Sequence, residues 1–226
     1  MTTNPSQTIE NYLKAIYELQ VSQGRAKTSS LAQRLGVTPG SVTDMLKRLA
    51  KQKPLLVSYQ SHHGVKLTAL GKKKALSVIR RHRLLETFLH DVMGYTWDEI
   101  HTEAERLEHC ISNRLTEAIA AYLNNPHCDP HGDPIPTQNG KMPEGAGRPL
   151  SELAIGSSAR ITRVHLQDEN ALQYLSQNDL VPGQTVTVIA KSPLDGQLTL
   201  KILHEESLHP FSLGPLVADE IDAEEL

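Results

Sequence analysis

The 226-residue sequence has only two cysteines, few aromatic residues and no long apolar run. Two cysteines, Cys110 and Cys128, are too few for a disulfide framework and are typical of a protein in a reducing compartment. No apolar stretch reaches the roughly 18 residues of a membrane helix, and the first residues lack the basic start and apolar core of a signal peptide. We therefore expect a cytoplasmic protein with no membrane partner and with room for two or three domains.

The net charge of −3 conceals a strong asymmetry along the chain. Residues 1–90 hold 15 Lys and Arg against 4 Asp and Glu, whereas residues 91–226 hold 8 against 22. A basic first part joined to an acidic remainder favours a polyanion, such as nucleic acid, as the partner of the first part. Scattered charge on a solvated face is the alternative explanation.

The first 72 residues show the pattern of a winged helix-turn-helix DNA-binding domain. Apolar spacing, caps and turn residues predict three helices and then two strands, over residues 9–21, 31–35, 39–51, 55–59 and 65–68. Gly36 ends the second helix, and Thr38 followed by Pro39 begins the third. A three-helix unit followed directly by a β-hairpin predicts a recognition helix and a wing.

We expect the polar face of the third helix to contact double-stranded DNA. Ser41, Thr43 and Asp44 are the candidates for reading base edges. Lys47, Arg48 and the wing residue Lys66 are the candidates for phosphate contacts. A small helical domain without DNA binding is the alternative, which the basic charge of this part disfavours.

The middle of the chain predicts a helical domain over residues 73–140. One long amphipathic helix is expected over residues 68–92, and a second over 96–123, where Thr96 and Glu99 have capping-box spacing. Two such helices bury too little apolar surface as an isolated pair, so we expect them to form the interface of a homodimer.

The C-terminal part predicts a small β domain after a linker. Residues 124–149 contain six prolines and are expected to be irregular, with 141–149 as the linker proper. Short strands are then expected over residues 159–164, 185–190 and 198–203, and a short helix near 171–176. We interpret residues 150–226 as a small β-barrel that ends in an acidic tail over 219–225. The fold class is therefore mainly α with small β.

The strongest chemical signal lies on the predicted helix over 96–123. Four polar side chains fall within an arc of about 100° when each residue turns by about 100°, and this arc borders the apolar stripe. They are His101, Glu105, Glu108 and His109. Two carboxylates three residues apart repel each other unless a cation lies between them, so the arc favours a metal site.

A second His/Glu pair, His82 and Glu86, lies four residues apart within an apolar stripe of the preceding helix. A hydrogen-bonded core pair is the ordinary explanation for one such pair. Two sets on neighbouring helices favour metal binding. A helical di-metal carboxylate enzyme and a regulator that senses an organic ligand are the alternatives. Because the enzyme needs Glu-x-x-His from two helices, we do not expect catalysis.

Five segments in order carry a resemblance to a known family. They are Glu10–Leu19, the helix-turn-helix, Arg81–Glu86, His101–His109 and Gly132–Pro136. This order resembles the diphtheria-toxin-repressor family of iron- and manganese-dependent transcriptional repressors. The resemblance implies a homodimer that binds palindromic operator DNA when loaded with metal. It also implies that the C-terminal domain is SH3-like and similar to the ferrous-transport accessory module.

The resemblance also implies two metal sites. The regulatory site would use Asn11, Glu105, Glu108 and His109. The ancillary site would use His82, Glu86 and His101, with Glu169 from the C-terminal domain. Iron-type members carry a thiol where Glu105 stands and a thioether where Asn11 stands, so the oxygen-rich set favours Mn(II), with Fe(II) as the alternative.

Two departures from the family pattern bear on these sites. Manganese-type members usually have Asp at the position of Asn11, and some have Glu at the position of Lys14. His127, Cys128 and His131 could form a separate soft-metal site, but they lack a fourth spaced ligand, so we interpret them as incidental.

Overall fold

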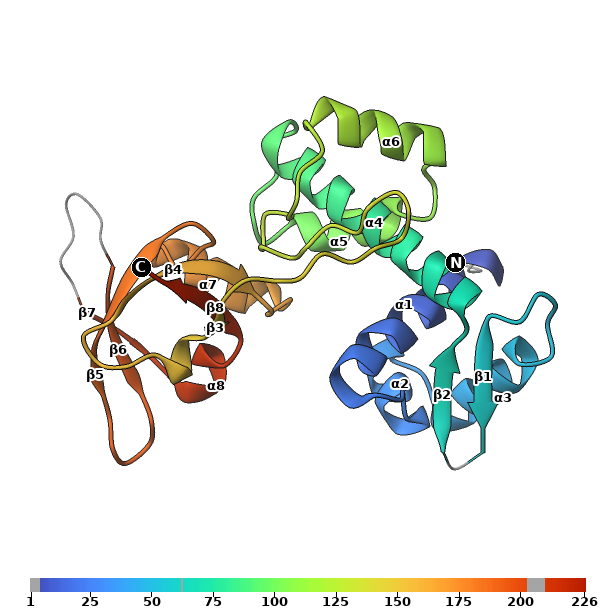
Figure 1. The fold of residues 1–226 in the computed structure, drawn as a ribbon, viewed down its shortest axis with the longest axis horizontal. Helices are drawn as coiled ribbons and strands as arrows, with labels where there is room; N and C mark the ends of the chain where they lie inside the picture. Colours follow the sequence, from blue (N-terminus) through green and yellow to red (C-terminus); the bar gives the residue numbers. More distant parts are fainter. Residues whose placement is uncertain (1–4, 62, 203–209) are drawn as a thin grey trace. The chain divides into compact units, whose positions relative to one another are not determined.

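The computed structural model describes residues 5–61, 63–202 and 210–226 (Figure 1). Contacts between residues divide the chain into two units, and the division falls within one helix, α4 (Ala69–Asp91). The first unit consists of Met1–His82, Glu108–Ile111 and Pro136–Met142. The second consists of Arg83–Leu107, Ser112–Ile135 and Pro143–Leu226.

The first unit begins with the predicted winged helix-turn-helix. Its elements are α1 (Pro5–Gln23), α2 (Thr28–Leu35), α3 (Pro39–Leu49), β1 (Val57–Gln60) and β2 (Gly64–Leu67). The two strands pair antiparallel from Val57 opposite Leu67 to Gln60 opposite Gly64. Apolar side chains from all three helices form its core, including the fully buried Leu13, Leu31 and Leu46.

Local signals explain where α2 ends and α3 begins. Gly36 has a φ of 62°, in the left-handed region that glycine adopts readily, and ends α2. Thr38 then caps α3, since its hydroxyl oxygen accepts a hydrogen bond from the Ser41 N–H at 3.3 Å. The sharp turn between the two helices leaves the polar side of α3 exposed to solvent.

The prediction of one continuous helix over residues 96–123 is wrong. The structure has two helices there, α5 (Ile100–Leu107) and α6 (Asn113–Tyr122). Ser112 begins α6 because its hydroxyl accepts from the Leu115 N–H at 3.2 Å, which competes with continuing the earlier helix. Glu108 and His109 therefore lie in the turn after α5, where the helical wheel no longer applies.

Among the helices that the structure describes, none is both long and apolar enough to cross a membrane. The helix predicted over 68–92 is confirmed as α4. Residues 124–147 are irregular, as predicted, apart from an isolated bridge between Cys128 and Pro134.

The C-terminal part forms a six-stranded antiparallel sheet (Figure 1). Its elements are β3 (Arg148–Pro149), η1 (Leu150–Glu152), β4 (Ser158–Val164), α7 (Glu169–Gln177), β5 (Thr185–Lys191), β6 (Leu198–Ile202), β7 (Pro210–Leu213), α8 (Pro215–Ala218) and β8 (Ile221–Glu225). The strand order is β3-β8-β4-β5-β6-β7. Between the described residues no pairing joins β3 to β7, so the sheet is SH3-like but not a closed barrel.

The predicted acidic tail is instead a strand. β8 pairs with both β3 and β4, and its Ile221 and Ala223 are buried while the acidic residues between and after them are less so. This alternation is the pattern of a strand with one buried face. The other three predicted strands are confirmed as β4, β5 and β6, although the predicted end of the last one, Leu203, lies outside the described residues.

Candidate metal centre

A group of charged side chains, here called the first cluster, lies within the first unit between α1, α4 and the turn after α5. It consists of Glu10, Lys14, Arg81, His82, Glu108 and His109. Glu108 is its most buried member, at 2% exposure. Glu108 Oε2 lies 3.1 Å from Lys14 Nζ and 2.6 Å from His82 Nδ1. A carboxylate from the turn is thus held directly by a cation on α1.

The second carboxylate of the first cluster, Glu10, is also paired. Glu10 Oε2 lies 2.8 Å from Arg81 Nη2 and 2.7 Å from His109 Nδ1. His109 Nε2 in turn lies 3.3 Å from Glu108 Oε1, so the histidine bridges the two acids. Each carboxylate of the cluster therefore has both an imidazole and a side-chain cation of the chain itself.

These partners determine the ionisation of both acids. Burial alone would raise the pKa of Glu108, but the hydrogen bond from His82 and the charge of Lys14 outweigh it and lower that pKa. Burial would also raise the pKa of Glu10, but the hydrogen bond to His109 and the charge of Arg81 outweigh it and lower that pKa. Both acids are carboxylates at neutral pH.

The structure places the four expected regulatory ligands in different surroundings. Glu108 and His109 lie in the first cluster, whereas Asn11 is exposed on α1. Glu105 is 56% exposed and lies 3.7 Å from His101 Nε2. Among the described residues, Glu105, Glu108 and His109 do not form a set whose ligand atoms converge within 4.8 Å. As the structure stands, this set does not fit a metal, because the Lys14 ammonium already contacts Glu108.

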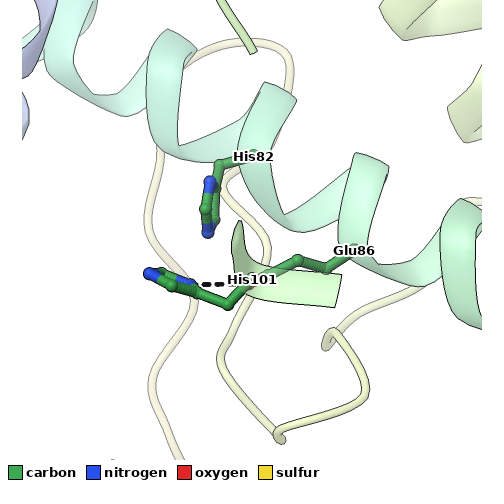
Figure 2. Close-up of side chains that lie close together, drawn as sticks. All are labelled: His82, Glu86 and His101. Carbon is green, nitrogen blue, oxygen red and sulfur yellow. Dashed lines mark hydrogen bonds and ion pairs between the residues drawn. The ribbon is translucent and has the colours of Figure 1, made fainter. Parts of the chain in front are cut away.

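The expected ancillary ligands do converge. Figure 2 shows His82 and Glu86 one turn apart on α4 and His101 on α5, with their ligand atoms within 4.8 Å of one another. His101 Nδ1 lies 3.0 Å from Glu86 Oε1. Imidazole and carboxylate are ligands that Mn(II), Fe(II) and Zn(II) share, so the donor set fits a divalent cation.

The fourth expected ancillary residue, Glu169, lies at the start of α7. Its side chain is exposed, and Oε1 accepts a hydrogen bond from the Thr102 hydroxyl at 2.7 Å. Thr102 directly follows His101 on α5. Glu169 is therefore held next to a ligand-bearing residue without belonging to the convergent set.

A group of buried side chains in the second unit, here called the second cluster, was not expected from the sequence. It consists of Glu86, Asp129 and His131, whose ligand atoms also lie within 4.8 Å of one another. All three are buried. Asp129 Oδ1 accepts from the backbone N–H groups of His131 and Asp133, at 2.9 and 3.0 Å. His131 Nε2 lies 3.1 Å from the carbonyl oxygen of Trp97.

The second cluster has the opposite electrostatics to the first. Burial, with the charges of Glu86 and Asp133, raises the pKa of Asp129 well above its usual range. Burial also lowers the pKa of His131, which favours the neutral imidazole. The fold therefore holds the Asp129 carboxyl group in surroundings that stabilise its ionised form poorly.

The expected DNA-contact residues lie on the surface of α3 and β2. Ser41, Asp44, Lys47, Arg48 and Lys66 are exposed. Thr43 is half-buried, and its hydroxyl donates to the Pro39 carbonyl oxygen at 2.9 Å, which leaves it only as an acceptor toward a base. The structure therefore presents five of the six side chains to a partner.

Sequence reasoning missed five members of the two clusters, which are Glu10, Lys14, Arg81, Asp129 and His131. Glu10 and Lys14 are one turn apart on α1, and this i, i+4 spacing could have placed them on one face. For Asp129 and His131 the sequence carries little signal, because their burial depends on Trp97 and Glu86, more than 30 residues away.

Three family models match successive parts of the chain. The N-terminal DNA binding domain of the iron dependent repressors matches residues 5–65, and their metal binding and dimerisation domain matches 68–137. The FeoA domain matches residues 148–223. The three matches together cover nearly the whole chain.

Named proteins are similar over the whole of this span or over part of it. The iron-dependent repressor IdeR of Mycobacterium leprae is 32% identical over 94% of this chain and 96% of its own. The HTH-type transcriptional regulator MntR of Oceanobacillus iheyensis is 36% identical over 53% of this chain and 80% of its own. A manganese-dependent transcriptional repressor solved in complex with manganese superposes with a TM-score of 0.87, at 36% identity, and covers 96% of this chain and 100% of its own.

These relatives decide between the function classes that the sequence left open. They are transcriptional repressors and not enzymes, so the expectation of a non-enzymatic protein is confirmed. The repressor relatives exclude the di-metal enzyme, and the matching domain, described as metal binding, favours a metal over an organic ligand as the signal.

Proposed function

Because the chain belongs to the diphtheria-toxin-repressor family of metal-dependent transcriptional repressors, we propose that it is a manganese(II)-dependent repressor. In this role it binds palindromic operator DNA as a homodimer in the cytoplasm and controls metal homeostasis. Iron(II) is the alternative metal. The manganese-dependent neighbour supports the first assignment, and the resemblance to IdeR supports the second.

The observation that carries metal binding is the convergence of His82, Glu86 and His101 (Figure 2). The shared histidine His82 also contacts Glu108 of the first cluster at 2.6 Å. A cation held by His82 would therefore act on the residue that ties the turn after α5 to α4. When bound, the metal would supply a positive charge that draws His82, Glu86 and His101 together, and packing of α4 against α5 would set where these side chains lie.

The regulatory set of Glu108, His109, Glu105 and Asn11 remains part of the proposal. Closing that set on a cation requires Lys14 Nζ to leave its position 3.1 Å from Glu108 Oε2, because two cations on one carboxylate oxygen repel. It also requires Glu105 to turn inward from its exposed position. Metal would then select this arrangement only by binding it better than the present one.

The dimer surface that we propose lies on α6 and the end of α4. Large apolar side chains are exposed there although a monomer gains nothing from exposing them. They are Val92, Met93, Tyr95, Leu115 and Tyr122. The ring of Tyr122 packs edge-on against Phe88, with 6.3 Å between ring centroids, so this surface is continuous from α6 to α4. A second copy with the same surface would cover it about a two-fold axis.

One titration tests the proposed function. The affinity of the full chain for operator DNA is measured without metal and with Mn(II), Fe(II) and Zn(II), at one fixed salt concentration. We expect at least a tenfold gain with Mn(II), and a smaller one with Fe(II) under anaerobic conditions. Equal affinity with and without every metal would contradict the proposal.

A further inference from the structure

We propose that Lys14 links α1 to the turn after α5 when no metal is bound, and that it does so as a tethered cation beside Glu108. Among the described residues, Glu105, Glu108 and His109 do not converge as metal ligands, whereas the Lys14 ammonium lies 3.1 Å from Glu108 Oε2. The inference rests on the proposed function, since it concerns how the metal-free chain binds operator DNA. Lys14 is then a positioning residue that gives the chain an operator affinity independent of metal.

The Lys14 ammonium lies between residues that the family resemblance assigns to metal. Its Nζ is 3.1 Å from Glu108 Oε2, in the expected regulatory set, and 3.3 Å from His82 Nδ1, in the expected ancillary set. An ammonium group carries a full positive charge and three N–H donors, so it stabilises an ionised carboxylate directly. The positive charge beside Glu108 is therefore supplied by α1 itself.

A second contact lies one turn earlier on α1. Glu10 Oε2 is 2.7 Å from His109 Nδ1, and His109 directly follows Glu108 in the turn. The Arg81 guanidinium of α4 donates to the same Glu10 oxygen at 2.8 Å. Two successive residues of the turn are thus held by two residues of α1 whose charges have opposite sign. One contact would let the turn pivot about it, whereas two contacts restrain its orientation as well as its distance.

Burial of the pair of Lys14 with Glu108 decides how much the link contributes. The Lys14 side chain is 12% exposed and that of Glu108 is 2% exposed. Arg34 and Glu18 form a short pair between α2 and α1, at 2.8 Å, but their side chains are 43% and 30% exposed. Exposed pairs contribute little because water and salt screen them, whereas removing one partner of a buried pair leaves an uncompensated charge. The buried pair is therefore the one whose loss should change how firmly the turn is held.

A link at Lys14 acts directly on the DNA-binding core. Leu13 precedes Lys14 in α1 and is fully buried, in one core with Leu31 of α2 and Leu46 of α3. Because these helices pack together, holding α1 also holds α3, whose polar face is exposed.

The linked arrangement is the one that favours operator binding, because the regulatory set implied by the family joins the same two segments, α1 and the turn. The apparent affinity for operator DNA scales with the fraction of chains in the competent arrangement. A contact that holds this arrangement without metal therefore raises the metal-free affinity.

The test measures the operator affinity of the full chain in excess EDTA, at one fixed salt concentration. Lys14→Gln should weaken this metal-free affinity at least fivefold, and Lys14→Arg, which keeps a cation, should stay within twofold of the parent. Lys191→Gln removes an equal charge from β5 of the second unit and should also stay within twofold. The proposal is overturned if Lys14→Gln binds like the parent, or if Lys14→Arg loses as much affinity as Lys14→Gln.

A double-mutant cycle with Glu108→Gln decides whether the two residues act as a pair. In EDTA, Glu108→Gln removes the negative partner and retains an oxygen that accepts hydrogen bonds. If Lys14 acts through Glu108, the double variant should bind operator no more than twofold more weakly than the weaker single variant. Losses that multiply in the double variant show that Lys14 acts elsewhere, and they overturn the proposal.

Amide hydrogen exchange of the chain alone, without DNA or metal, separates this inference from the proposed function. Exchange over residues 108–111 should be at least fivefold faster in Lys14→Gln than in the parent, and Arg34→Gln, which breaks the exposed pair, should leave it unchanged. Exchange that is indifferent to Lys14, in a chain whose operator affinity rises with Mn(II), overturns this inference alone. Exchange that depends on Lys14, in a chain that binds no operator, supports the link and refutes the proposed function.

Discussion

The two clusters hold buried carboxylates in opposite ways. In the first cluster, Glu108 lies 3.1 Å from Lys14 and Glu10 lies 2.8 Å from Arg81, so the chain supplies one cation for each acid. In the second cluster, Asp129 Oδ2 has no hydrogen-bond donor and forms only a loose ion pair with Arg83, at 3.6 Å. The pKa shifts follow this contrast, lowered for Glu10 and Glu108 and raised for Asp129.

The contrast indicates how each cluster would respond to metal. A metal approaching the first cluster must compete with tethered ammonium and guanidinium groups, which are present at all times. In the second cluster Asp129 also faces a tethered cation, Arg83, but at 3.6 Å this pair is looser than the pair of Glu108 with Lys14 at 3.1 Å. We therefore expect the tethered Lys14 and Arg81 to oppose metal binding by the first cluster.

The largest effect should come from Glu108→Ala, which would break the first cluster. Removing one partner of a buried ion pair costs about 3–5 kcal/mol, because Lys14 and His82 would lose their shared acceptor. Since Lys14 retains 12% exposure, we expect the lower end of that range. Urea unfolding of the full chain measures the change, and operator binding should no longer rise with Mn(II).

The matched control is Glu105→Ala, three residues away and 56% exposed, which should change stability by no more than about 0.5 kcal/mol. The effect of Glu108→Ala should also depend on pH. Since the folded-state pKa of Glu108 is below its ordinary value of 4.5, its stabilisation is present above that value and lost as pH falls through the folded pKa. A difference between parent and variant that persists undiminished at strongly acidic pH would contradict the assignment.

The next largest effect is expected from Lys14→Gln. This change would leave Glu108 without its close cation, as Asp129 is in the second cluster. Without the ammonium, Glu108 keeps a hydrogen-bond donor but loses its cation, so Mn(II) no longer competes with a tethered charge. We expect Mn(II) affinity of the first unit to rise roughly tenfold, equivalent to about 1.4 kcal/mol, in a calorimetric titration. Lys74→Gln changes the net charge equally on an exposed part of α4 and is the control. Equal affinity for Mn(II) in both variants would show that Lys14 does not compete with metal.

How far the sequence predicts these regions depends on the range of the interactions. The winged helix was predicted because its signals are local: Gly36 ends one helix, and Thr38 with Pro39 begins the next. The break between α5 and α6 was missed because the apolar spacing continues across it, and the cap at Ser112 carries a weaker signal. β8 was missed for its acidic composition, although Ile221 and Ala223 alternate with acids at strand spacing.

The candidate sites show the same limit. His82, Glu86 and His101 lie on two helices that the sequence predicts. Packing of these helices side by side is enough to bring the three side chains together. The choice of Asn11 over Glu10 rested on the family pattern, whereas the facing side of α1 is set by packing of Leu13 and Ile16. The polar groups that a fold buries far from any motif, such as Asp129, depend on contacts that a single sequence does not carry.

A smaller effect is expected where a cation of the first unit is exposed instead of buried. Lys47 lies exposed on α3, so Lys47→Ala should leave stability and metal binding unchanged while weakening DNA binding. If it contacts one phosphate, the slope of log affinity against log salt should flatten by about 0.9. Lys191→Ala, on β5 of the second unit, should leave the slope unchanged. An unaltered slope in Lys47→Ala would remove this residue from the phosphate contacts.

The smallest effect is expected at Glu169, which would sharpen the comparison at the edge of the second unit. Its carboxylate is exposed and accepts from the Thr102 hydroxyl at 2.7 Å, and an exposed bond of this kind contributes about 0.5–1 kcal/mol. Glu169→Gln keeps an acceptor for Thr102 and removes only the negative charge. If Glu169 is an ancillary ligand, Mn(II) binding should weaken in this variant, while Thr102→Val, which removes the hydroxyl alone, should leave it unchanged. If both variants bind Mn(II) like the parent, Glu169 serves only to hold α7 beside α5, and Glu86, His101 and His82 bind their cation without a ligand from the C-terminal sheet.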